Sequence, residues 1–125
     1  MPLVMIVDDS QAHRSALLRL LEREGYDTLP AEDGRDALAQ LHRHQPDLIV
    51  TDLNMPGIDG LELLEALQQH PSHRRIPVIM LTAQSDTHCV RRAEQLGAKE
   101  YLVKATFSVG QMMDQVRKYT QDIEH

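Results

Sequence analysis

Short runs of apolar residues recur along the chain, and each run ends at polar or turn residues. Such runs, rich in β-branched and aliphatic residues, are typical of strands buried on both faces of a parallel sheet. Pro77 lacks a backbone N–H, so it is tolerated only near the start of its strand. We predict five strands, at residues 3–7, 26–31, 48–51, 76–81 and 100–103.

Between and after these runs, apolar residues recur at the spacing of a single helix face. Ser10 is a typical N-terminal cap, and Gly25 and Gly97 are typical of positions just beyond a helix. Pro46 disfavours helical backbone at the residue before it. We predict five helices: from Ser10 to Gly25, from Asp33 to the Gln45–Pro46 pair, around 61–67 with an end near His70, at 86–96 and at 109–119.

Strand and helix thus alternate five times, which predicts an α/β fold with a parallel sheet covered by helices on both faces. Right-handed crossovers place the carboxyl ends of all its strands on one edge, where ligands bind in open sheets of this kind. The length of 125 residues is typical of one domain. We expect that domain to cover residues 1–120 and to be followed by a polar tail at 121–125.

The composition excludes several classes of function. The net charge of −6 argues against a nucleic-acid or anionic-membrane surface, since both select for basic patches. Cys89 is the single cysteine, so an intramolecular disulfide is impossible and a reducing compartment fits. No apolar run approaches the roughly 18 residues of a membrane span, and the first residues lack a basic region. We expect a soluble cytoplasmic protein.

Polar side chains of a particular kind follow four of the predicted strands. Asp8 and Asp9 follow the first strand, Asp52 the third, Thr82 the fourth and Lys104 the fifth. Converging carboxylates repel each other unless a cation is present, and oxygen ligands without His or Cys suit Mg²⁺. A hydroxyl and an ammonium are suited to hold phosphoryl oxygens. This pattern predicts Mg²⁺-assisted phosphoryl chemistry with Asp52 as the nucleophile.

Each of these residues also has an ordinary structural interpretation. Asp8 and Asp9 would cap a helix, and Asp52 would cap the next helix or start a turn. Thr82 would belong to a turn, and Lys104 would be a solvated surface charge. Their shared position at the predicted strand ends favours a site.

The segments that carry these residues also resemble a known family. The sequence resembles the receiver domain of two-component response regulators, of the chemotaxis-regulator type. That resemblance implies a flavodoxin-like, doubly wound sheet with strand order 2-1-3-4-5. The matching segments cover nearly the whole chain in family order: Val7–Ser10, Asp33–Leu38, Asp52–Gly60, Leu81–Ala83, Gly97–Ala98 and Tyr101–Lys104.

The resemblance implies specific roles at the strand ends. Asp52 would accept a phosphoryl group from a sensor histidine kinase or a phosphotransfer protein. Mg²⁺ would be held by Asp8, Asp9, Asp52 and the backbone carbonyl of Asn54. Thr82 and Lys104 would contact the phosphoryl oxygens.

Further residues would transmit or tune the signal. The resemblance implies that Tyr101 moves inward when Thr82 is drawn to the phosphoryl group, and that Asn54 and Gln84 tune the rate of hydrolysis. The output surface would comprise the helix at 86–96, the strand at 100–103 and the helix at 109–119. Through it the protein would control a downstream target or an output domain that this chain lacks, or form a homodimer. We expect neither nucleic acid nor membrane to bind this domain.

One position departs from the family pattern. The family usually has Lys-Pro with a cis peptide bond after the fifth strand, and this chain has Lys104-Ala105. A cis bond before a residue other than proline costs about 2.5–4 kcal/mol. This cost favours a trans bond and a reshaped loop, and it leaves both the isomer and the exact placement of Lys104 open.

Three other classes of function fit less of the sequence. A receiver-like scaffold that is never phosphorylated is kept open by the altered loop at Ala105. A phosphohydrolase with an aspartyl-phosphate intermediate would need a second acid two residues after the nucleophile, where this chain has Asn54. A dinucleotide-binding protein would carry a glycine-rich fingerprint after the first strand, which is missing. We expect a signalling receiver and not a turnover enzyme.

The histidines are predicted to be surface residues that form no metal site, and Cys89 to be a small buried apolar residue. The histidines are His13, His42, His44, His70, His73, His88 and His125.

Overall fold

A five-stranded parallel sheet forms the centre of the protein, in the strand order β2-β1-β3-β4-β5. The computed structural model describes residues 1–83, 87–106 and 108–121. The predicted fold class and strand order are confirmed. The strands are β1 (Leu3–Val7), β2 (Asp27–Ala31), β3 (Leu48–Thr51), β4 (Val78–Thr82) and β5 (Glu100–Val103).

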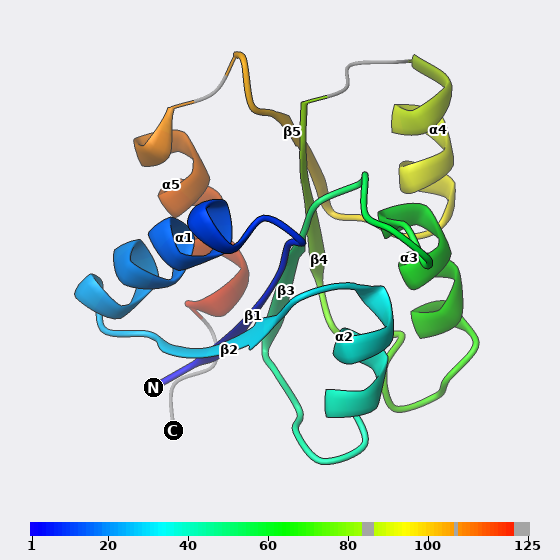
Figure 1. Cartoon of the computed structure of the whole chain (residues 1–125), viewed down its shortest axis with the longest axis horizontal. Helices are drawn as coiled ribbons and strands as arrows, with labels where there is room; N and C mark the ends of the chain where they lie inside the picture. Colours follow the sequence, from blue (N-terminus) through cyan, green and yellow to red (C-terminus); the bar gives the residue numbers. More distant parts are fainter. Residues whose placement is uncertain (84–86, 107, 122–125) are drawn as a thin grey trace.

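Helices cover both faces of this sheet (Figure 1). Two helices, α1 and α5, pack on one face, and the other three pack on the opposite face. The helices are α1 (Gln11–Arg23), α2 (Gly34–Gln40), α3 (Gly60–Gln68), α4 (Thr87–Gln95) and α5 (Val109–Thr120).

Polar side chains cap the first turns of helices, just before the apolar residues that recur at helical spacing. The side chain of Ser10 accepts a hydrogen bond from the backbone N–H of His13 at the start of α1. Asp59 and Glu62 form a reciprocal capping box at the start of α3. Gly25 and Gly97 follow α1 and α4 with φ of 94°, a backbone conformation that favours glycine.

The three central strands are buried on both faces, as their continuous apolar sequences predict. Because successive side chains of a strand point to opposite faces, each strand supplies two separate core layers. Met5 and Val7 of β1 face the layer under α2, α3 and α4, while Val4 and Ile6 face the layer under α1 and α5. This aliphatic core holds the strand ends in fixed positions.

Helix α2 is shorter than predicted. It ends at Gln40, and the chain continues through tight turns in which His42 and Arg43 donate to carbonyl oxygens three residues back. Pro46 disfavours a further helical turn in the residues before it. The prediction that the helix reaches Gln45 is therefore wrong at its last turn.

His73 is buried, with 6% of its surface exposed, so the prediction that it is a surface residue is wrong. Its ring stacks on that of His70 with 3.9 Å between the ring centroids, and it hydrogen-bonds to the backbone of Leu41. Burial lowers the pKa of His73 below its ordinary value of 6.5, and the neighbouring His70 and His42 lower it further. Cys89 is half-buried and packs against the core under α2, α3 and α4.

Across the described ranges, none of the helices combines the length and the apolar character that crossing a bilayer requires.

Candidate functional site

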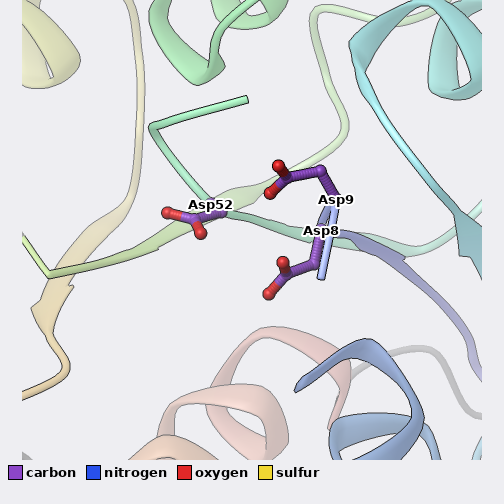
Figure 2. A group of neighbouring side chains, drawn as sticks. All are labelled: Asp8, Asp9 and Asp52. Atoms are coloured by element: carbon purple, nitrogen blue, oxygen red, sulfur yellow. The ribbon is translucent and has the colours of Figure 1, made fainter. Parts of the chain in front are cut away.

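Three carboxylates meet at the carboxyl ends of β1 and β3. Figure 2 shows Asp8, Asp9 and Asp52 projecting from these strand ends toward the same side. One oxygen of each carboxylate lies within 4.8 Å of the others. Asp8 is buried, Asp52 is partly buried and Asp9 is exposed. The register of β1 against β3, which pairs Val7 with Thr51, brings them together.

The two oxygens of Asp52 have different surroundings. Oδ1 accepts hydrogen bonds from the backbone N–H groups of Leu53, at 2.7 Å, and Asn54, at 3.4 Å. Oδ2 lies 3.2 Å from the Nζ of Lys104. One oxygen is thus held by the backbone and the other faces a cation.

Lys104 reaches this position from the end of β5. Its backbone N–H donates to the carbonyl of Thr82 at 2.7 Å, which extends the pairing of β4 with β5 by one residue. The Lys104–Ala105 peptide bond, whose isomer the sequence left open, is trans. The N–H of Thr106 donates to the carbonyl of Val103 at 2.9 Å and closes a turn. The altered loop therefore still directs the ammonium toward Asp52.

His13, which was predicted to be an ordinary surface residue, lies beside these groups. Its Nδ1 contacts Oδ2 of Asp8 and lies 3.5 Å from the Nζ of Lys104. The other oxygen of Asp8 accepts from the N–H of Ser10 at 2.9 Å. Arg14 donates to the carbonyl of Asp8 at 2.6 Å. The first turn of α1 thus surrounds Asp8, a relationship that the cap at Ser10 could have suggested from the sequence.

The other predicted site residues lie at or near the same edge. Thr82 is fully buried at the end of β4. Tyr101 is half-buried on β5 and packs against the core layer under α2, α3 and α4. Asn54 is exposed in the segment after β3. Gln84 lies outside the described residues.

The donor set fits a hard divalent cation. Three carboxylates offer oxygen atoms within reach of one another, and one ammonium balances only part of their negative charge. Mg²⁺ is typically bound through one or two carboxylates while it keeps several waters, and the exposure of Asp9 leaves room for water. The oxygen donors of these residues and their spacing therefore suit Mg²⁺.

Comparison with known families identifies this arrangement. The family model of the response regulator receiver domain matches residues 4–117. The chain belongs to this family of two-component signalling domains, as its sequence resemblance indicated.

Relatives of different lengths share this domain. Sporulation initiation phosphotransferase F of Bacillus subtilis is 33% identical over 116 residues, covering 93% of this chain and 91% of that protein. The phosphate regulon transcriptional regulatory protein PhoB of Rhizobium meliloti is 37% identical over 118 residues, covering 94% of this chain and 51% of that protein. The chain thus spans nearly all of one relative and about half of the other.

The fold is shared with solved structures. The signal receiver domain of a signal transduction histidine kinase from Syntrophus aciditrophicus superposes with a TM-score of 0.90 at 33% identity. The match covers all of this chain, 100%, and 94% of that one.

Proposed function

We propose that Asp52 accepts a phosphoryl group in a two-component phosphorelay, from a sensor histidine kinase or a phosphotransfer protein. The observation that carries this proposal is the arrangement around Asp52: two further carboxylates with oxygens within 4.8 Å, and the ammonium of Lys104 at 3.2 Å. A carboxylate nucleophile can form an acyl phosphate, and both cation and ammonium stabilise the charge of a transferring phosphoryl group.

The phosphoryl transfer uses the oxygen of Asp52 that faces Lys104. Oδ1 is held by backbone N–H donors, whereas Oδ2 faces the ammonium that would hold the transferred phosphoryl oxygens, so Oδ2 is the oxygen proposed to attack. Its electron pair forms the new O–P bond while the bond from phosphorus to the donor breaks and its electrons leave with the donor. Lys104 and Thr82 contact the phosphoryl oxygens and orient them.

Mg²⁺ is held in this proposal by Asp8, Asp9, Asp52 and the backbone carbonyl of Asn54. When bound, the ion neutralises the carboxylates and the negative charge of the incoming phosphoryl group. Among the protein groups, Asp8 is fixed by the N–H of Ser10, so it needs little reorganisation to take part.

Phosphorylation is proposed to switch the surface formed by α4, β5 and α5. Thr82 lies at the site and pairs with Val103 of the neighbouring strand β5. Tyr101 lies two residues before Val103 on that strand. A movement of Thr82 toward the phosphoryl group would make room for Tyr101 to turn inward, which is a local change that biases a two-state element. The altered surface would bind a downstream protein, an output domain or a second copy of the chain. Gln84 and Asn54 would tune the lifetime of the phosphorylated state.

Residues 1–120 form the proposed receiver unit, with residues 121–125 as a tail. The chain would act either by contact with a separate target or as part of a longer regulator. One relative is matched over nearly its whole length and another over about half of its length, which supports both arrangements.

Two alternatives predict different chemistry. A scaffold would take up no phosphoryl group, and a phosphohydrolase would turn over repeatedly. Asn54 occupies the position at which such a hydrolase needs a general acid, and an amide cannot supply that proton. This favours a receiver over a turnover enzyme.

The proposal is tested with acetyl phosphate as the donor, in Mg²⁺ and in excess chelator. We expect one phosphoryl group per chain in Mg²⁺ and a large loss of uptake in chelator. No uptake in Mg²⁺ would support the scaffold. Sustained release of phosphate from an aryl phosphate ester would support the hydrolase.

A further inference from the structure

His13 lies between two groups of opposite charge in the site. Its Nδ1 contacts Oδ2 of Asp8 and is 3.5 Å from the Nζ of Lys104. The ring is partly exposed, with a side-chain exposure of 34%, whereas the side chain of Asp8 has an exposure of only 3%. Nδ1 of His13 is therefore close both to the ammonium of Lys104 and to the buried carboxylate of Asp8.

The chemistry of the two neighbours of Nδ1 of His13 determines whether this nitrogen carries a proton. An ionised carboxylate only accepts hydrogen bonds and an ammonium only donates them, so one nitrogen cannot bond to both. The contact with Asp8 is the closer, so Nδ1 carries the proton and donates to Oδ2. Lys104 then lies beside the ring without a hydrogen bond to it, and its acceptor is Asp52.

We propose that His13 is a positioning residue of the phosphoacceptor site: its ring satisfies Asp8 and keeps Lys104 directed at Asp52. This inference rests on the proposed function, because it takes Asp8 to be a ligand of Mg²⁺. Groups that hydrogen-bond to metal-binding carboxylates orient them and affect both affinity and activity.

The fold explains how His13 reaches this place. It is the third residue of α1, and its backbone N–H is bound by the cap Ser10. Side chains in a helix lean toward its N-terminus, so a residue in the first turn reaches back over the strand end that precedes it. Ser10 and Arg14 bind Asp8 from the same turn.

Loss of the ring has a definite consequence. Oδ2 of Asp8 would be left without its donor in a buried position, and Lys104, whose Nζ lies 3.5 Å from the place of that ring nitrogen, would be a cation free to move toward it. The ammonium would then compete with Mg²⁺ for Asp8 and would be drawn away from Asp52. Both the affinity for Mg²⁺ and the rate of phosphorylation at saturating Mg²⁺ should fall.

The test compares His13→Met with His13→Asn by calorimetric titration of Mg²⁺ alone. Met removes the donor at similar size, whereas the amide nitrogen of Asn is the same number of bonds from Cβ as Nδ1. We expect Met to weaken Mg²⁺ binding about 10-fold and Asn to restore most of that loss. Equal binding by the parent and the Met variant, or a loss in Asn as large as in Met, would overturn the proposal. Circular dichroism of each variant verifies that it is folded.

A double-mutant cycle separates positioning from general disturbance. If His13 acts by holding Lys104 away from Asp8, the effect of His13→Met should largely vanish in a chain that already carries Lys104→Met. The same loss of affinity in both backgrounds would overturn the proposal.

These titrations do not depend on phosphorylation, so the two proposals can fail separately. A parent that binds Mg²⁺ with the expected coupling but takes up no phosphoryl group would contradict the proposed function alone. If the parent is phosphorylated but His13→Met lowers the Mg²⁺ affinity equally with and without Lys104→Met, this inference alone would be contradicted. A parent that binds no Mg²⁺ would contradict both.

Discussion

The Nζ of Lys104 lies 3.2 Å from Oδ2 of Asp52, although the two residues are 52 positions apart in the chain. They follow β5 and β3, which are separated in the sheet by β4. The parallel arrangement brings both strand ends to one edge, and the Lys104 side chain spans the remaining gap. This contact joins the proposed nucleophile to the cation that would hold its phosphoryl group.

Lys104→Met is expected to tighten Mg²⁺ binding a few-fold, because it removes a positive charge that competes for the carboxylates. The effect is modest because the ammonium is partly exposed and solvent screens it. Calorimetric titration measures it, and Lys104→Arg, which keeps the charge, is the control. Equal affinities in the Met variant and the parent would contradict this account of the site's charge.

Gly60→Ala tests the close approach of α3 to the site. A Cβ at Gly60 would lie 2.5 Å from the carbonyl oxygen of Asp52, so the backbone at the site must move. We expect a loss of about 1–3 kcal/mol in the free energy of unfolding, measured in urea. Gly110→Ala is the matched control, since the nearest atom to its Cβ would be 3.7 Å away. Alanine is the better helix former, so that change should not destabilise. Equal effects at the two glycines would contradict the packing described.

Stability is expected to fall as the pH drops below 6.5 because of His73. Its burial lowers the pKa of the folded state, so the unfolded chain binds the proton more readily. The stability contributed by neutral His73 is present above the unfolded value of 6.5 and is lost as the pH falls through the lower folded pKa. Urea unfolding between about pH 7.5 and 5 measures the slope. His73→Gln, which keeps a donor for the carbonyl of Leu41, should have the shallower slope; an unchanged slope would argue against this assignment.

Tyr119 is expected to ionise only at strongly alkaline pH. Burial and its hydrogen bond to Glu100, at 2.5 Å, raise the pKa of Tyr119 to about 12. Ultraviolet titration of the phenolates should show this late component in the parent, and Tyr119→Phe should remove it. If the late component survives in Tyr119→Phe, it belongs to another tyrosine. The hydrogen bond also ties α5 to β5 within the proposed output surface.

The fold was largely predictable because its signals are local. Each central strand is apolar on both faces, so a run such as Leu3–Val7 can be recognised without knowledge of its neighbours. Asp8, Asp52 and Lys104 follow such runs directly, so topology alone predicts that they converge. The last turn of α2 was mispredicted because short-range turns and Pro46 compete there with the helical pattern.

The surroundings of the histidines could not be predicted in this way. His73 is buried because the loop after α3 packs against the end of α2, and no apolar pattern marks that contact. His13 reaches Asp8 because the first turn of α1 folds back over β1. The positions of both histidines depend on how a loop or the first turn of a helix packs against the rest of the protein. The periodicity of apolar residues carries no information about such contacts. The sequence predicted that the three carboxylates converge but did not predict the ring that contacts one of them.

The most direct test of the central claim is the intact mass of the parent and of Asp52→Asn after incubation with acetyl phosphate and Mg²⁺. The amide that this substitution introduces is a poor nucleophile of nearly the same size as the carboxylate, so the variant should retain the fold and lose the acceptor. We expect a gain of one phosphoryl group in the parent and none in the variant. An equal gain in both proteins, or no gain in a parent that binds Mg²⁺, would contradict the assignment of Asp52 as the phosphoacceptor.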